Sequence, residues 1–175
     1  MPTSEQTPQQ DETGAGAKYR FRNTRAGQGE IFDSSGELVW RYAPPPSGLN
    51  FLNGPLRGPD LILSAPDRRE RLRIQRERTF PLSRFTITGR HSPLGSIESM
   101  SIISTYYAAQ FANGSSWVFQ IPTFTADFSG HSDDGAVVRV HIANELVWYA
   151  LIDEGHDSPE LIASLALMHS ERCRW

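Results

Sequence analysis

Near its C-terminus the chain carries a segment that is apolar at nearly every position, and this segment restricts the fold more than any other feature. Residues 161–168 read LIASLALM and follow Ser158-Pro159-Glu160. A serine that caps free amides, a proline suited to the first helical position and a glutamate near the positive end of the helix dipole predict a helix from about residue 158 to 171. A helix apolar on all sides must be surrounded on all sides, and this one is too short to span a bilayer. We therefore expect the rest of the domain to enclose it.

The part of the chain before this helix is a series of short segments rich in β-branched and aromatic residues. Turn-forming clusters such as Ser34-Ser35-Gly36 and Asn113-Gly114 separate these segments, which is typical of an all-β protein. A sheet closed on itself leaves no exposed strand edge. The sequence therefore predicts a mainly β fold, a closed barrel of many strands around the C-terminal helix. The expected strands are residues 18–25, 30–33, 37–42, 60–64, 71–78, 84–88, 95–99, 102–112, 116–121, 124–128, 136–142 and 146–152.

Length and charge narrow the class of protein further. A chain of 175 residues with 38% hydrophobic residues is the size of one domain, which we place at residues 18–175 behind a polar, disordered tail at residues 1–17. The single cysteine, Cys173, excludes an internal disulfide framework and a four-cysteine zinc site. The net charge of −3 argues against nucleic acid as a partner. With neither a secretory signal nor a long apolar run in view, we expect a cytoplasmic protein.

Three stretches give the chain a resemblance to a known family. They are residues 61–76 (LILSAPDRRERLRIQR), residues 85–97 (FTITGRHSPLGSI) and residues 148–168 (WYALIDEGHDSPELIASLALM). In order and pattern they resemble the tubby C-terminal-like superfamily, which includes the phospholipid scramblases and the LURP-one-related proteins. The resemblance implies a barrel of about twelve strands wrapped around a hydrophobic C-terminal helix. It also implies binding of phosphoinositide head groups through basic residues, as in tubby proteins, or an association with calcium and lipid movement, as in scramblases. The cysteine-rich stretch of the best-known scramblases is absent from this sequence.

The densest charged segment lies at residues 68–78, RRERLRIQRER, with six arginines against two glutamates. If this segment is a strand, Arg71 and Arg73 share one face, while Leu72 and Ile74 point into the core. Planar guanidinium groups on a rigid strand suit phosphate oxygens. The alternative is a solvated strand face in an arginine-rich chain. The candidate anion-binding or lipid-binding residues are Arg69, Arg71, Arg73, Arg76, Arg84 and Arg90.

Two acidic loops are the remaining candidates for chemistry. Asp133 and Asp134 in one loop, and Asp153 and Glu154 in the other, carry oxygen ligands that a hard cation such as calcium prefers. Neither loop has the ligand spacing of a helix-loop-helix calcium site, and turn formation also explains these residues, so we expect no cofactor and leave calcium open. No nucleophile elbow, zinc-protease motif or phosphate-binding loop occurs in the sequence, so we expect no catalytic residues and no enzyme.

The function that fits best is a non-enzymatic lipid-binding or membrane-associating domain that recognises anionic, phosphorylated head groups through the basic strand. Residues 47–52 and Trp175 could add apolar contacts with a membrane interface. Two alternatives remain open. One is a protein-interaction module, and the other is a small-molecule carrier with a pocket at the barrel rim. Peripheral association with a membrane would accompany only the lipid-binding function.

Overall fold

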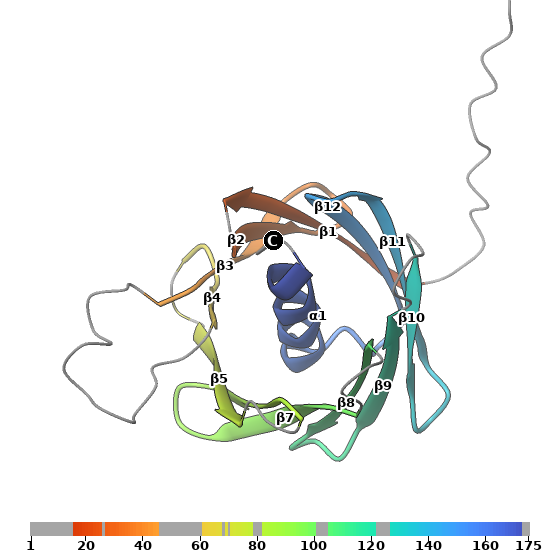
Figure 1. The fold of residues 1–175 in the computed structure, drawn as a ribbon. Coiled ribbons are helices and arrows are strands. Elements are labelled where there is room, and N and C mark those ends of the chain that lie inside the picture. The colour runs from red at the N-terminus through yellow and green to blue at the C-terminus, as the bar shows by residue number, and fades with distance from the viewer. Residues whose placement is uncertain are drawn as a thin grey trace, which may run out of the picture.

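In the computed structural model, twelve antiparallel strands form one sheet closed into a barrel around helix α1. The structure describes residues 16–25, 27–45, 61–67, 69, 71–78, 82–100, 105–121 and 127–172. Figure 1 looks along the barrel and shows α1 in its centre. The expected tail lies outside the described residues as far as residue 15, as do residues 47–52, Cys173 and Trp175. The mainly β, closed barrel with an enclosed C-terminal helix is therefore confirmed.

Each strand pairs with its neighbours in the sequence, and pairing of β1 with β12 closes the barrel, from Gly16 opposite Asp153 to Arg22 opposite Val147. The strands are β1 Gly16–Arg25, β2 Gln28–Phe32, β3 Leu38–Ala43, β4 Leu61–Ser64, β5 Arg71–Arg78, β6 Arg84–Thr88, β7 Pro93–Ser99, β8 Thr105–Phe111, β9 Ser116–Ile121, β10 Phe128–Ser132, β11 Val137–Asn144 and β12 Val147–Asp153. The helix α1 spans Pro159–Arg172. Such a closed sheet leaves no strand edge unpaired.

One expected strand was placed wrongly. The sequence pattern favoured residues 124–128, of which 124–126 lie outside the described residues, whereas β10 spans Phe128–Ser132. This strand reads FSGHS and contains none of the β-branched residues on which the expectation depended. Its glycine has a packing reason, because a Cβ on Gly130 would lie 2.5 Å from the Phe119 ring of the neighbouring strand. Close approach of an aromatic ring therefore accounts for a strand that propensity alone does not indicate.

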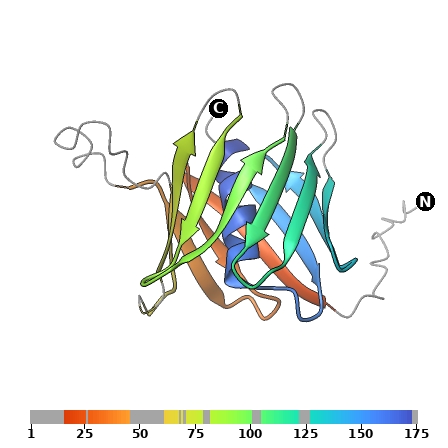
Figure 2. The same ribbon diagram turned by 90° about the horizontal axis from the view of Figure 1, so that it is seen from below.

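Helix α1 provides the centre of the core. All residues at positions 161–170 are buried, and the inward residues of the strands pack around them. The Ser158 hydroxyl oxygen accepts a hydrogen bond from the amide of Leu161 at 3.3 Å, which is the expected cap. Figure 2 shows the helix inside the barrel, surrounded by the strands of the wall. Within the described part of the chain, no helix has both the length and the apolar character needed to cross a membrane.

The last turns of α1 are fixed to the barrel wall by polar contacts. The buried His169 Nδ1 is hydrogen-bonded to the Tyr42 hydroxyl of β3 at 2.5 Å, and Arg76 of β5 lies 2.6 Å from the carboxylate of Glu171. Burial lowers the pKa of His169 to about 4, so this side chain is neutral at pH 7. A Cβ on Gly29 of β2 would lie 2.2 Å from the Tyr42 hydroxyl, so only glycine leaves room for the pair. These contacts connect the helix end to β3 and β5.

Candidate functional site

The candidate site begins with a cross-strand row on the outer wall of the barrel. Arg41 of β3 lies opposite Ser64 of β4, and Ser64 lies opposite Arg71 of β5. Because side chains alternate along a strand, Tyr42 and Leu72, the neighbours of the two arginines, point into the core and are buried. Two strand spacings separate the backbones of Arg41 and Arg71, roughly 10 Å. A hydroxyl group therefore lies between two guanidinium groups on a rigid surface.

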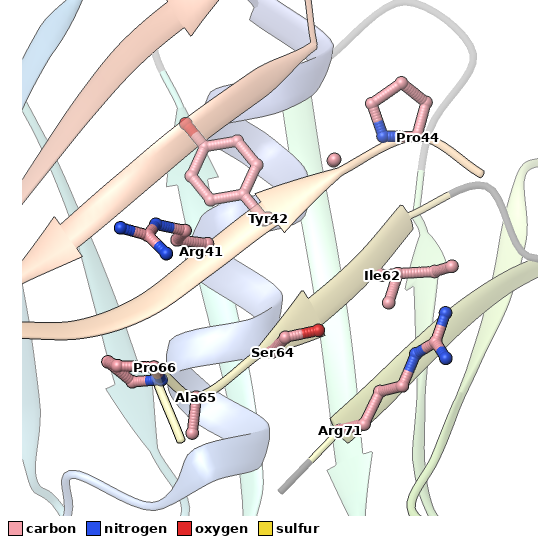
Figure 3. Close-up of a pocket in the computed structure, with 9 residues that line it drawn as sticks. Arg41, Tyr42, Pro44, Ile62, Ser64, Ala65, Pro66 and Arg71 are labelled. Atoms are coloured by element: carbon pink, nitrogen blue, oxygen red, sulfur yellow. The ribbon is translucent and has the colours of Figure 1, made fainter. Parts of the chain in front are cut away.

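An open pocket of about 330 Å³ lies over this row. Figure 3 shows its residues, with Ser64 between the strands that carry Arg41 and Arg71. Pro44 and Pro66 follow β3 and β4, and they add apolar walls without an amide donor. The lining residues are Arg41, Tyr42, Ala43, Pro44, Ile62, Ser64, Ala65, Pro66 and Arg71. The pocket thus combines two cations and a hydroxyl with small apolar surfaces.

The same row extends across β1 and β2. Arg22 lies opposite Glu30, and Glu30 lies opposite Arg41, so the outer wall carries Arg22, Glu30, Arg41, Ser64 and Arg71 in sequence. We name these five residues the arginine row. Glu30 Oε2 lies 2.5 Å from an Arg22 amino group, and Glu30 Oε1 lies 3.6 Å from Arg41 Nε. The hydrogen bond from Arg22 is the largest cause that lowers the pKa of Glu30 below its usual range. The row carries three cations and one anion.

Arg71 and Arg73 are the two arginines of this wall for which the described residues provide no ion-pair partner. Both are exposed on β5, and neither makes an ion pair with any residue that the structure describes. Arg73 lies opposite Ile62 of the pocket lining. The expectation that Arg71 and Arg73 share an outward face, with Leu72 and Ile74 in the core, is confirmed. Two guanidinium groups are therefore available to an anion from solution.

The other expected arginines lie apart from this pocket. Arg69 is in the turn before β5, 3.7 Å from Asp67, and Arg90 is exposed in the turn between β6 and β7. Arg84 lies on β6, 3.5 Å from Glu77. Arg76 pairs with Glu171 of the enclosed helix, and its guanidinium lies 4.8 Å from the centre of the Phe85 ring. The structure thus brings Arg71 and Arg73 together and distributes the rest over other contacts.

Arg41 and Ser64 are the site residues that sequence analysis missed. Arg41 lies in the outward alternation of residues 38–43, which identifies it as exposed, but nothing local shows that it lies near Arg71. That proximity depends on how β3 pairs with β4 across the connection at residues 44–60. The pattern of one strand cannot supply the register between two strands joined by a long connection.

The two acidic loops contact each other through a bond between the His156 side chain of one loop and the Asp134 carboxylate of the other. His156 Nε2 lies 2.9 Å from Asp134 Oδ2, and the Ser132 hydroxyl donates a hydrogen bond to the other oxygen of the same carboxylate. The Ser132 bond, followed by the His156 bond, lowers the pKa of Asp134 to about 2. The same contact with Asp134 is the largest cause that raises the pKa of His156. The pair holds the loop before α1 against the β10–β11 turn.

Two of the remaining acidic candidates accept hydrogen bonds from backbone amides. Asp133 accepts a hydrogen bond from the amide of Ser116 at 3.2 Å, and Asp153 accepts one from the amide of Val137 at 2.8 Å. Glu154 is exposed in the turn after β12. No group of three or more potential metal-ligating side chains gathers within the described ranges. Calcium binding by these loops therefore gains no support from their geometry.

The fold and the wall pocket define a class of protein: a closed barrel of twelve strands around a hydrophobic helix, with a basic outer face on β3–β5. Among solved structures, this chain is similar to the X-ray structure of a protein from Arabidopsis thaliana. The TM-score is 0.61 at 10% sequence identity, over 90% of this chain and 92% of the other. Comparisons with protein-family models and with curated proteins found no match. A likeness at this sequence identity shows the fold alone, so what it confirms is the barrel of about twelve strands around a C-terminal helix.

Proposed function

We propose that this protein is a non-enzymatic domain that associates with membranes by binding anionic, phosphorylated lipid head groups on the outer wall of β3–β5. The observation that carries the proposal is the pocket over Ser64 between Arg41 and Arg71. Arg71 and Arg73, which lack an ion pair within the described residues, provide its attraction for anions. A head-group phosphate accepts hydrogen bonds from guanidinium groups two at a time.

The mode of binding follows from where the arginines are placed. They lie on strands of a closed sheet, so little backbone entropy is lost when a ligand binds. The chain as a whole carries a net charge of −3, so the attraction to an anionic surface must be local and confined to this wall. Such an attraction weakens as salt is added, because exposed charges are screened beyond about 8–10 Å at physiological ionic strength.

The interior of the barrel is filled, which favours a binding site on the outer wall. The core positions of the twelve strands pack against α1, which occupies the centre. A carrier that holds its ligand inside a barrel needs that space. The small-molecule alternative could use the wall pocket instead, where the two arginines again favour an anion.

The test is co-sedimentation of the full chain with vesicles of phosphatidylcholine, alone or mixed with phosphatidic acid, phosphatidylserine or a phosphoinositide, across a salt series. We expect salt-sensitive binding to the phosphorylated lipids that falls at least tenfold in Arg71→Ala/Arg73→Ala, since two charge-assisted contacts are lost, each worth on the order of 1 kcal/mol. The matched control is Lys18→Ala/Arg139→Ala, which removes two charges from the outer faces of β1 and β11.

Binding that does not distinguish anionic from neutral vesicles, or that both double variants reduce equally, would contradict the proposal. A stoichiometric protein partner that co-purifies with the chain, together with no response to any lipid, would instead favour the protein-interaction alternative.

A further inference from the structure

We infer that Arg41 is a movable arm of the wall pocket and that Glu30 holds it away from the bound anion, so that Glu30 and the anion compete for the same guanidinium. This inference rests on the proposed function, because it concerns the regulation of the same pocket. It assigns to Glu30, a residue that no motif indicated, control over the affinity of the site.

The geometry places Arg41 between two partners. Arg41 belongs to the pocket lining, and Ser64 lies directly opposite it in the sheet. Its guanidinium, however, is turned away from Ser64 and Arg71 in Figure 3, and its Nε lies 3.6 Å from Glu30 Oε1. The Arg41 side chain is 60% exposed, so no packing fixes it in this position. A long, flexible stem allows the guanidinium to turn toward the pocket.

Release of Arg41 would not leave Glu30 unpaired. The two contacts of this carboxylate are unequal, with Arg22 at 2.5 Å and Arg41 at 3.6 Å. Arg22 is itself placed by Phe32, since its guanidinium lies 5.0 Å from the centre of that ring. Glu30 therefore keeps its closer partner when Arg41 leaves, and the cost of release is that of one long, exposed ion pair.

This competition favours ligands with concentrated charge. A phosphate monoester carries nearly two negative charges near neutral pH, whereas a diester carries one. The lowered pKa of Glu30 means that its carboxylate stays ionised, so a ligand must attract Arg41 more strongly than this single charge does. The shared chemistry of the favoured ligands is therefore a phosphomonoester, on a lipid head group or on a molecule free in solution.

The direction in which Glu30→Gln changes phosphate affinity distinguishes this inference from the alternative, in which Glu30 positions Arg41 for the ligand. If Glu30 holds Arg41 back, Glu30→Gln releases the arm and tightens binding. If Glu30 instead positions Arg41 for the ligand, the same substitution weakens binding. The matched control is Glu77→Gln, which also removes one negative charge from the outer wall. It frees Arg84, at 3.5 Å, which does not belong to the pocket lining as Arg41 does.

The experiment titrates inorganic phosphate into the full-length, 15N-labelled chain and follows the side-chain Nε–H signals of Arg41 and Arg71 by NMR. We expect Glu30→Gln to bind phosphate about two- to fivefold more tightly than Glu77→Gln does, which corresponds to the loss of one exposed ion pair. In an Arg41→Ala background the difference between the two variants should disappear. Thermal unfolding checks that all variants are folded.

Two vesicle series run in parallel, phosphatidylcholine with phosphatidic acid, a monoester, and phosphatidylcholine with phosphatidylserine, a diester. Glu30→Gln should increase binding to phosphatidylserine more than to phosphatidic acid, because the diester gains most from the loss of a competitor. If no vesicle binds but the phosphate titration behaves as expected, the proposed membrane function fails and the inference about Glu30 stands.

Three results would overturn the inference. They are equal phosphate affinity for Glu30→Gln and Glu77→Gln, weaker affinity for Glu30→Gln, and no change of the Arg41 signal with phosphate in any variant. Any of these together with salt-sensitive vesicle binding that needs Arg71 and Arg73 would leave the proposed function standing without this control of Arg41.

Discussion

At the residue scale, two histidines of this chain show how environment decides charge. His156 is near the surface beside the Asp134 carboxylate, and the hydrogen bond between them raises the pKa of His156. His169 is fully buried among the rings of Phe21, Tyr42 and Trp148, and burial lowers its pKa to about 4. The two histidines therefore give the stability of the fold opposite dependences on pH.

The pair of His156 and Asp134 gives a prediction for NMR titration. Because its folded pKa lies above its unfolded value, His156 adds stability below the unfolded pKa, and this contribution is lost as pH rises through the folded pKa. Asp134→Asn should lower the pKa of His156 toward its ordinary value near 6.5 and remove that pH dependence. The control is Asp133→Asn, which removes a neighbouring charge bonded to the Ser116 amide. An unchanged His156 titration in Asp134→Asn would refute the assignment.

At the element scale, the end of helix α1 depends on one strand residue. The Tyr42 hydroxyl of β3 is hydrogen-bonded to the buried His169, and Ser170 donates a long bond, at 3.4 Å, to the carbonyl of Gly27. A buried polar atom that loses its partner costs more than the bond itself contributes. The contact between α1 and β3 is therefore a point where the fold is sensitive to a single atom.

Tyr42→Phe tests this dependence because it removes only the hydroxyl group. We expect the free energy of unfolding, measured by urea titration at pH 7, to fall by about 1–3 kcal/mol, since His169 Nδ1 is left buried without its partner. Tyr149→Phe is the matched control, because Tyr149 is 46% exposed on β12 and should tolerate the same change within about 0.5 kcal/mol. Equal losses in the two variants would show that the Tyr42 hydroxyl adds no stability.

The elements that sequence analysis located are those with strong local patterns. The start Ser158-Pro159-Glu160 and the apolar run after it place α1 within one residue of its observed bounds, Pro159–Arg172. The strand β5 has the bounds that the sequence predicted, residues 71–78. In contrast, β10 was misplaced, because its polar sequence is held by pairing with β9 and β11 rather than by propensity. Tertiary context decides such strands.

At the scale of the whole molecule, the site was only half visible in the sequence. Arg71 and Arg73 belong to one charged run, so a local pattern indicates them. Arg41, Ser64 and Glu30 join them only when the four strands β2–β5 are paired in register. The register between consecutive strands therefore assembles a row of side chains that no short motif contains.

The proposed function also predicts how the whole barrel lies on a membrane. If the wall pocket binds head groups, the barrel should dock on its side, with β3–β5 toward the lipid and the far strands in water. In a Cys173→Ser background, which removes the chain's one cysteine, a polarity-sensitive fluorophore can be attached at Gln75→Cys on β5 or at Gln120→Cys on β9. Both positions are exposed, and β9 lies four strands further round the barrel.

We expect vesicles that contain phosphatidic acid to shift the emission of the β5 label to the blue, because it enters the head-group region, and to leave the β9 label unchanged. High salt should reverse the shift. A shift confined to the β9 label, or equal at both positions, would mean that another face of the barrel meets the membrane and that the outer wall of β3–β5 is not the docking surface.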